Sequence, residues 1–293
     1  MMKSSLEGWK VMTDEEFSQL SQLVQDHLGI HWDGRKKEMV QNRLRKRIKF
    51  LKLESFHHYV QFIVEHPNHP EWQELYNAVT TNLTTFFREP LHFNFLKNEW
   101  IPFLQRRALT GRGRKLRLWS AACSTGAEPY SLAMLLHHHL GTTGLLKWDI
   151  RILASDINTK VLEQAKNGCY LTEEVAAVPQ VLRDAYFKEK TLPGGQHCYC
   201  VRTYLQEMID FRPINLINTS YPIKAKLDLI LCRNVLIYFE RKTSLAIVHR
   251  LIDLLQEGGY LLLGHAETLP ELPGIRRLPG NIYRKPIAGS EFC

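Results

Sequence analysis

Two carboxylates and a run of small residues carry the clearest chemistry in this 293-residue sequence. Residues 116–122 begin with alternating apolar positions, which predict a buried strand. The small residues Ser120–Gly126 let a ligand approach the backbone closely. Glu128 and Pro129 then open a helical pattern, because proline suits the first turn of a helix. Strand, small-residue loop and helix form the first half of a nucleotide-type site at the carboxyl edge of a parallel sheet.

This loop lacks the features of a phosphate cradle. It contains one glycine, Gly126, whereas the P-loop and dinucleotide fingerprints need more glycines at fixed spacing. The acidic Glu128 at the helix start repels phosphate and favours a cation. S-adenosylmethionine has no phosphate and carries a sulfonium and an ammonium group. Its ribose hydroxyls can donate hydrogen bonds to a carboxylate. An ordinary strand-to-helix turn is the alternative interpretation.

A second carboxylate, Asp156, follows the apolar segment 150–155, which predicts another strand. In doubly wound folds, a carboxylate at the end of the second strand meets the ribose hydroxyls. We therefore expect Asp156 to bind the ribose of the cofactor. A cap for the following helix is the alternative role.

The elements that must position these residues alternate between strands and helices. Further strands are predicted at 208–212, 227–232 and 260–264, with helical patterns between them and a closing edge strand at 281–285. This alternation predicts an α/β fold with a doubly wound, mostly parallel sheet. Residues 12–80 contain amphipathic helical patterns, beginning with a capping box at Thr13. They predict a small all-α domain.

We expect two domains with a boundary near residue 90. Residues 1–90 form the N-terminal helical domain with its linker, and residues 91–293 form the sheet domain. Residues 169–207 are too long for a simple crossover. The turn signal Pro193–Gly195 predicts a hairpin within them. Because a lone hairpin is unstable, we expect it to pack as a small β-subdomain inserted in the sheet domain.

Composition is that of a soluble globular protein, with 44% hydrophobic and 23% charged residues. The sequence has no run of 18 apolar residues and no signal-peptide pattern, so we expect a cytoplasmic protein without membrane insertion. In that compartment the six scattered cysteines are expected to be reduced thiols. Cys198 and Cys200 lack the second pair of a zinc site, so no metal is expected.

The formal net charge of +8 is unevenly distributed. Residues 35–52 hold nine basic residues and one acidic residue, whereas residues 1–90 as a whole hold 12 of each. This local cluster predicts an acidic partner. Nucleic acid is one candidate. However, enzymes that methylate amino groups of nucleic acids show an Asn/Asp-Pro-Pro-aromatic motif after the fourth strand, and residues 233–238 contain no proline.

Together, these segments resemble the chemotaxis receptor methyltransferases, the CheR family of S-adenosylmethionine-dependent protein-glutamate O-methyltransferases. The resemblance runs in family order from about residue 14 to 285. Two positions depart from the family pattern: Ala127 replaces a glutamate and Ala266 a serine. The motifs that carry it are Asn82-Leu-Thr84-x-Phe-Phe-Arg88, Ser120–Ser131, Ala154–Ile157, Asn215-Leu216, Cys232–Phe239 and Gly264–Glu267.

The resemblance implies a class I, Rossmann-like methyltransferase that methylates glutamate γ-carboxylates on the cytoplasmic helices of chemoreceptors. This reaction serves sensory adaptation in bacterial chemotaxis, and its product is S-adenosylhomocysteine. Arg88 would pair with the methionyl carboxylate of the cofactor, and Asn215 would hydrogen-bond the adenine edge. The full set of implied cofactor contacts is Asn82, Thr84, Arg88, Glu128, Asp156, Asn215, Leu216, Asn234 and Val235.

A glutamate acceptor is already ionised at neutral pH, so the enzyme must chiefly align the reactants and remove water. Tyr238 and one of Arg106 or Arg107 are candidates to orient the acceptor carboxylate. A tyrosine at the edge of the core and a solvated helix face are the alternative interpretations. A methyltransferase-like scaffold without activity is a further alternative, which the intact polar positions disfavour.

Two surfaces are expected to bind the receptor. The basic residues Arg43, Arg45, Lys46 and Arg47 would dock its acidic helices. The β-subdomain would hold the receptor's C-terminal pentapeptide by strand addition, as it does in some members of the family. A plain connecting hairpin is the alternative.

Overall fold

The computed structural model describes residues 11–109, 114–145, 148–191 and 194–287. Its contacts divide the chain into two compact units, Met1–Thr81 with Tyr238–Glu240, and Asn82–Ile237 with Arg241–Cys293. Residues 82–89, which we expected to be a linker of the first domain, therefore join the second unit. The reason is hydrogen bonding, because Ser124 Oγ donates to the carbonyl of Asn82 (2.7 Å) and the Phe87 N–H donates to Ser131 Oγ (2.9 Å).

The first unit is the expected small helical bundle. The Thr13 hydroxyl accepts the Glu16 N–H, the Glu16 carboxylate accepts the Thr13 N–H, and Gly29 ends the first helix with φ 70°. Its apolar faces bury residues such as Val24, Leu44 and Ile63. The elements are α1 (Asp14–Leu28), the 3₁₀ turn η1 (Gly34–Lys36), α2 (Lys37–Phe50), α3 (Phe56–Glu65) and α4 (Glu71–Val79).

The second unit is built on a seven-stranded sheet in the order β6-β2-β1-β7-β8-β10-β9. Strands β6, β2, β1, β7 and β8 are parallel, and β10 and β9 add an antiparallel edge. The prediction of a doubly wound, mostly parallel sheet is confirmed. The strands are β1 (Lys115–Ala121), β2 (Asp149–Asp156), β6 (Ile209–Pro213), β7 (Leu227–Cys232), β8 (Leu255–Leu263), β9 (Arg276–Leu278) and β10 (Ile282–Arg284).

The chain leaves β1 toward β2 and β6 on one side and later adds β7 and β8 on the other. The adjacent carboxyl ends of β1 and β7 therefore mark the topological switch point, where such folds bind ligands. Central strand residues such as Trp119, Leu229 and Leu262 are fully buried, because helices cover both faces of the sheet.

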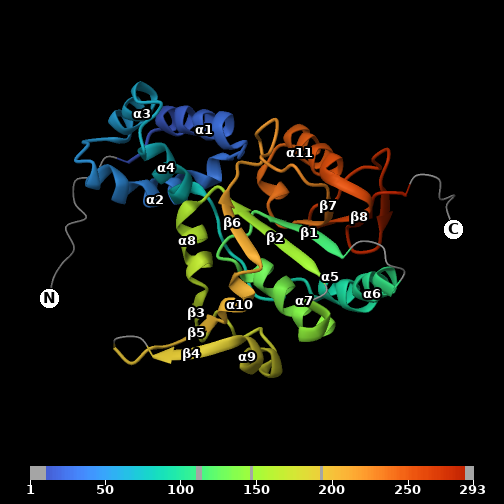
Figure 1. The fold of residues 1–293 in the computed structure, drawn as a ribbon. Coiled ribbons are helices and arrows are strands. Elements are labelled where there is room, and N and C mark those ends of the chain that lie inside the picture. The colour runs from blue at the N-terminus through green and yellow to red at the C-terminus, as the bar shows by residue number, and fades with distance from the viewer. Residues whose placement is uncertain (1–10, 110–113, 146–147, 192–193, 288–293) are drawn as a thin grey trace. The chain divides into compact units, whose positions relative to one another are not determined.

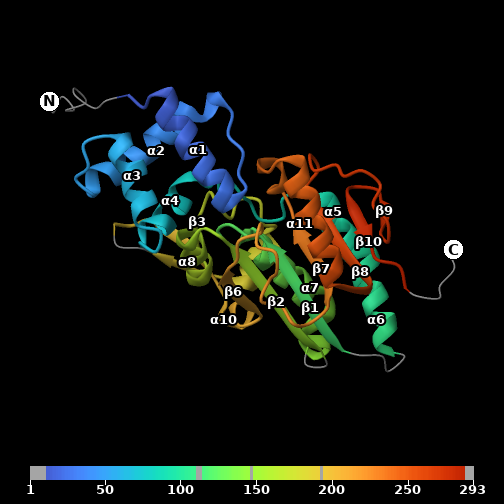
Figure 2. The ribbon, with the colours of Figure 1, turned by 90° about the horizontal axis from the view of Figure 1, so that it is seen from above.

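The helices α7 and α11 lie on opposite faces of this sheet (Figures 1 and 2). In the described part of the chain, no helix is long and apolar enough to span a bilayer. The helical elements of this unit outside the small sheet are α5 (Pro90–Phe95), the π-helical turn η2 (Leu96–Trp100), α6 (Ile101–Leu109), α7 (Ala127–Leu145), α8 (Thr159–Asn167) and α11 (Arg241–Leu254), and the 3₁₀ turn η3 (Leu236–Tyr238) begins in it.

A second, three-stranded sheet forms the predicted β-subdomain. Its order is β3-β5-β4, so β4 has a free edge, and β4 and β5 form the expected antiparallel hairpin. Gly194 and Gly195 lie in its turn with φ of 98° and 82°, whereas Pro193 is outside the described residues. The elements are β3 (Cys169–Leu171), α9 (Gln180–Tyr186), β4 (Phe187–Thr191), β5 (His197–Val201) and α10 (Thr203–Gln206).

One expectation about this region is wrong, because Cys169 and Cys200 form a disulfide instead of remaining thiols. The two residues face each other in the β3–β5 register, and their Cα atoms are 4.0 Å apart. The sequence separates them by 31 residues, so only the antiparallel pairing brings them together. Cys123, Cys198 and Cys232 are buried free thiols.

Candidate functional site

Unusual backbone conformations gather at the carboxyl edge of the central strands. Among the described residues, seven that are not glycine have positive φ, and five of these belong to the loops at this edge. Such conformations cost roughly 1–3 kcal/mol each and persist where the surrounding structure enforces them. They mark this edge as a candidate functional site. The five residues are Phe87, Glu89, Ala122, Ser124 and Asn234.

Two glycines allow these loops to pack closely. Gly126 has φ 88°, and a Cβ there would lie 2.8 Å from the Cβ of Ala165. At Gly264 a Cβ would lie 2.7 Å from Asn234 Nδ2 and 2.8 Å from Glu267 Oε2. Any larger residue would therefore push the loops after β1 and β7 out of place.

Asp156 ends β2 and holds two turns through its carboxylate. Oδ2 accepts the N–H of Ser124 (2.9 Å), and Oδ1 accepts the N–H of Asn158 (2.9 Å). Burial raises the pKa of Asp156, while these backbone donors act in the opposite direction. Helix α8 is capped by Asn158, whose Oδ1 accepts two N–H groups. A carboxylate can accept about four hydrogen bonds, and Asp156 also accepts the N–H of Ile157, so it keeps capacity for about one more donor.

A buried arginine, Arg233, joins three segments of the site. Its Nη1 lies 3.0 Å from Glu128 Oε2, and its Nη2 lies 3.0 Å from Glu89 Oε2 and also donates to the carbonyl of Arg88. The Arg233 side chain is 2% exposed, and each carboxylate is 11% exposed. Ser120 Oγ donates to the other oxygen of Glu128 (2.6 Å). Removing one partner from such a buried group costs about 3–5 kcal/mol.

Glu89 is held in its charged form by this network. Burial acts to raise its pKa, but hydrogen bonds from Asn234 and His265 and the charge of Arg233 lower the pKa to about 2. His92 lies beside Glu89, and burial together with the charge of Arg233 lowers the pKa of His92 to about 4. Glu89, His92 and His265 have ligand atoms within 4.8 Å of one another. Because Arg233 already contacts Glu89, we assign no metal there.

Glu267 connects the loops after β7 and β8. Its carboxylate accepts backbone N–H groups from Asn234 (2.9 Å), Val235 (2.7 Å), Leu236 (2.6 Å) and Gly264 (2.6 Å). The residue is 4% exposed. Burial raises the pKa of Glu267, and the four N–H donors act against that rise. Glu267 thus satisfies donors that would otherwise be buried without a partner.

The structure places most of the predicted cofactor residues on loops at this one edge. The Asn234 amide donates to Glu89 Oε1 (3.0 Å), and Arg88 Nη1 donates to the carbonyl of Leu83 (2.9 Å). Leu216 is buried, and the side chain of Asn215 accepts the N–H of Ile217 (3.2 Å). Asn215 and Leu216 follow β6, whose last residue pairs with Asp156. Asn82, Thr84 and Val235 are partly exposed in the same loops.

Arg106 and Arg107 lie elsewhere, which corrects their expected catalytic role. Both belong to the last turn of α6. Arg107 Nη2 is 3.4 Å from Asp228 Oδ1, and Asp228 stands near the amino end of β7. Four residues of strand separate Asp228 from Cys232, a span of about 13 Å. Arg107 therefore stabilises the end of the sheet opposite to the strand-end loops, and Arg106 is exposed in the same helical turn.

Tyr238 ends η3, four residues after Asn234. Its carbonyl accepts the N–H of His31 (2.9 Å), and it groups with the first unit. Its expected role in orienting the acceptor carboxylate stays a prediction.

The predicted docking arginines differ in their availability. Arg47 binds the buried Glu71, with its Nε 3.0 Å from Oε1, and lies 3.4 Å from Glu74. Arg43 donates to the carbonyls at the end of α4. These two arginines therefore hold the bundle together. Arg45 is partly buried and Lys46 is exposed.

Sequence reasoning missed three residues of the site: Glu89, Arg233 and Glu267. Arg233 directly follows β7, whose last four residues, Leu229–Cys232, are apolar and buried, and a charge at that point signals a buried partner. Glu89 and Glu267 stand in or beside motif segments, but their partners lie 144 and 33 residues away along the chain. Only the fold reveals those pairs.

The geometry defines a class of protein. A doubly wound sheet with a switch-point loop and no phosphate cradle suits a cationic nucleoside ligand when one carboxylate ends β2 and another stands in the first turn of α7. These residues fit S-adenosylmethionine, since Asp156 retains acceptor capacity and Glu128 supplies a negative charge. The site is that of an S-adenosylmethionine-dependent methyltransferase.

Comparison with known proteins identifies the family. The family model "CheR methyltransferase, SAM binding domain" matches residues 82–279, and "CheR methyltransferase, all-alpha domain" matches residues 15–80. A chemotaxis protein methyltransferase of Escherichia coli (strain K12) is 40% identical over 261 residues, covering 89% of this chain and 87% of the relative. Chemotaxis protein methyltransferase 2 of Pseudomonas aeruginosa is 37% identical, covering 94% of each chain. The chain belongs to the CheR methyltransferase family and uses S-adenosylmethionine as methyl donor.

The role of Glu267 yields a stability prediction. We expect Glu267→Gln to lower the free energy of unfolding by about 2 kcal/mol or more, because an amide cannot accept all four N–H groups. Denaturant unfolding measures the change. Glu271→Gln, an exposed position in the same segment, is the matched control and should unfold like the unsubstituted protein. Equal stability of the two variants would contradict this role.

Proposed function

We propose that this methyltransferase esterifies glutamate γ-carboxylates on the cytoplasmic helices of chemoreceptors, in bacterial chemotaxis. The observation that carries the proposal is that the relatives matching both units are chemotaxis protein methyltransferases. The proposed substrate would place the protein in the cytoplasm. The DNA- or RNA-binding alternative lacks a comparable observation.

The proposed cofactor roles follow from charge and position. S-adenosylmethionine supplies a methyl group activated on a sulfonium. Asp156 would accept hydrogen bonds from the ribose hydroxyls, and Glu128 would pair with the ammonium group. Arg88 would pair with the carboxylate, and Asn215 would bind the adenine edge. Asn82, Thr84, Leu216, Asn234 and Val235 would complete the walls. Because Arg233 compensates only part of the charge of Glu89 and Glu128, excess negative charge would favour a cationic ligand.

The acceptor needs orientation more than activation, because its carboxylate is ionised at neutral pH. Two effects would provide most of the rate enhancement: alignment of the carboxylate with the methyl group, and removal of water from the carboxylate. Tyr238 is the remaining candidate for this orientation.

A methyl-transfer assay tests the proposed function. With labelled S-adenosylmethionine and a purified receptor cytoplasmic fragment, we expect incorporation of label that mild base releases as methanol. Asp156→Ala should weaken binding of S-adenosylhomocysteine by about 1.5–3 kcal/mol, the contribution of hydrogen bonds to a charged group. Asp210→Ala, an exposed aspartate on β6, is the control. Base-stable label, or transfer to nucleic acid instead of receptor, would refute receptor esterification.

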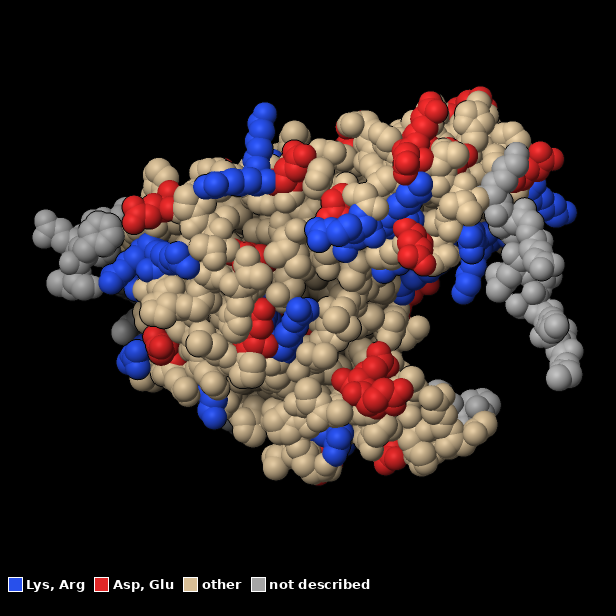
Figure 3. Space-filling model, turned by 180° about the vertical axis from the view of Figure 1, so that it is seen from behind, with Lys and Arg blue, Asp and Glu red and all other residues tan. Residues whose placement is uncertain are grey.

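The basic helix α2 is the proposed docking surface for acidic receptor helices. A hollow of about 570 Å³ in the first unit is lined by Arg43 and Lys46 together with Asn42 and Asn77. Arg43 and Arg47 are held by α4, so Arg45 and Lys46, with the exposed Lys49, would make the contacts. On the face shown in Figure 3, basic and acidic side chains are interspersed, so the proposed docking surface is limited to these named residues.

Charge reversal tests this surface. Lys46→Glu with Lys49→Glu should raise the KM for the receptor several-fold and leave the affinity for S-adenosylhomocysteine unchanged. Added salt should raise the KM of the unsubstituted protein, since exposed charges are screened over about 8 Å at physiological ionic strength. Lys97→Glu with Lys166→Glu makes the same charge change at exposed sites of the second unit. If neither added salt nor charge reversal on α2 changes the KM for the receptor, docking by α2 is excluded.

The β-subdomain is the proposed site for the receptor's C-terminal pentapeptide. Strand β4 has a free edge, and residues 188–191 are exposed. A peptide added there would gain backbone hydrogen bonds and contacts from alternate side chains. Phe187 is buried and anchors the strand in the core.

Titration with a pentapeptide containing Trp and Phe tests the tether. We expect micromolar binding that is lost on deletion of residues 194–196, because the deletion shortens the turn that supports β4. The deletion variant must still bind S-adenosylhomocysteine and methylate receptor without a tail. No binding at millimolar peptide would leave the hairpin as a connection only.

A further inference from the structure

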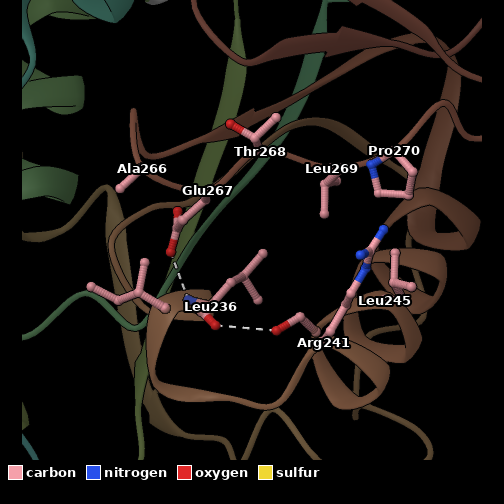
Figure 4. Close-up of a pocket in the computed structure, with 10 residues that line it drawn as sticks. Leu236, Arg241, Leu245, Ala266, Glu267, Thr268, Leu269 and Pro270 are labelled. Carbon is pink, nitrogen blue, oxygen red and sulfur yellow. Dashed lines mark hydrogen bonds between the residues drawn. The ribbon is translucent and has the colours of Figure 1, made fainter.

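A pocket of about 390 Å³ lies between the loop after β8 and the start of α11. Figure 4 shows Leu269, Pro270 and Leu245 on one side, and Leu236 with Glu267 on the other. Ser244 Oγ donates to the carbonyl of Leu236 (3.1 Å), which ties α11 to the turn η3. Its volume is at the low end of the range of about 300–1,000 Å³ for ligand pockets. It is large enough for one or two side chains.

The pocket shares Glu267 with the loops of the methyltransferase site. The carboxylate of Glu267 accepts the N–H groups of Asn234 and Leu236 together. Two residues of chain span at most about 7 Å, so Leu236 lies within that distance of Asn234. One turn of a substrate helix advances 5.4 Å and two turns about 11 Å. A helix that presents a glutamate beside Asn234 therefore carries another side chain over the pocket.

Arg241 is the charged residue of the pocket lining that is open to a partner, since the carboxylate of Glu267, also in the lining, accepts four backbone N–H groups. Arg241 and Lys242 are exposed in the first turn of α11. This turn lies entirely within the described residues and contains no acidic residue. Cations near a helix N-terminus are disfavoured by the helix dipole, so an acidic partner would relieve that repulsion. In Figure 4, Arg241 extends along the pocket toward Leu269 and Pro270. Ile237, 51% exposed, adds apolar surface to the lining.

We propose that this pocket binds an apolar side chain of the substrate helix, one or two turns from the acceptor glutamate, while Arg241 pairs with an acidic side chain of the same helix. The proposal rests on the proposed receptor-methylating function. It makes the pocket a determinant of which glutamates are modified, because only helices with this spacing fill it.

The test compares two tryptophan variants of the full-length protein. Ala266→Trp puts an indole into the pocket, whereas Ala246→Trp puts one on the exposed side of α11, outside the lining. We expect Ala266→Trp to raise the KM for a receptor cytoplasmic fragment about tenfold, the effect of losing a well-buried anchor. Ala246→Trp should leave KM unchanged, and both should bind S-adenosylhomocysteine normally. Arg241→Ala should raise KM more than Lys242→Ala, which lies outside the pocket lining.

A receptor variant identifies the occupant. Changing the apolar side chains one and two turns from the acceptor to aspartate should raise KM for the unsubstituted enzyme. The same change should have little further effect with Ala266→Trp, because two changes at one contact are not additive.

Each remaining outcome overturns the proposal. Equal KM values for Ala266→Trp and Ala246→Trp exclude the pocket as a substrate contact. Weaker binding of S-adenosylhomocysteine assigns it to the cofactor site, and a changed oligomeric state assigns it to a second copy of the chain. If the unsubstituted protein forms no base-labile ester on the receptor, the proposed function itself fails. Ester formation with unaffected variants removes only the pocket inference.

Discussion

The site depends on one buried guanidinium. Arg233 follows β7 and is neutralised by Glu128 from α7 and by Glu89 from the segment before α5. Each of these three segments contributes predicted cofactor positions, and none is adjacent to another in sequence. Because a buried ion pair that loses a partner is strongly destabilising, the three segments are held in one arrangement. The same network leaves one carboxylate charge uncompensated, and a cationic ligand could balance it.

Glu267 and Asp156 also hold segments of the site together, but they bind backbone N–H groups instead of a charged side chain. Both are buried carboxylates that accept N–H groups from loops at the strand ends. Two of the donors, Ser124 and Asn234, have positive φ. The loops are thus pre-organised by acceptors in the protein, which reduces the ordering that ligand binding must supply.

The sequence predicted the strand ends well, because a carboxylate after a buried strand has few possible places in a doubly wound fold. Asp156 ends β2 at the position that its sequence predicts, and its role toward the cofactor stays a prediction. Charge alone was a weaker guide, since Arg47 looks free in the sequence and its partner Glu71 is 24 residues away. Arg107 was misplaced for a related reason: its helix precedes β1 and meets the amino end of the sheet. The Cys169–Cys200 link required the strand register.

The β-subdomain has a part that is packed into the main core and a part that is exposed. Tyr170, Tyr186 and Phe187 belong to the main core, whereas residues 188–191 and 194–197 are exposed. The disulfide holds Cys169 and Cys200, near the two ends of the subdomain, at a Cα separation of 4.0 Å. The chain between them therefore starts and ends at nearly the same place, whatever its length. In an evolving lineage, the hairpin tip can change its length or composition while the anchor stays constant. The exposed tip can therefore diverge between paralogues without any change at the carboxylates at the strand ends.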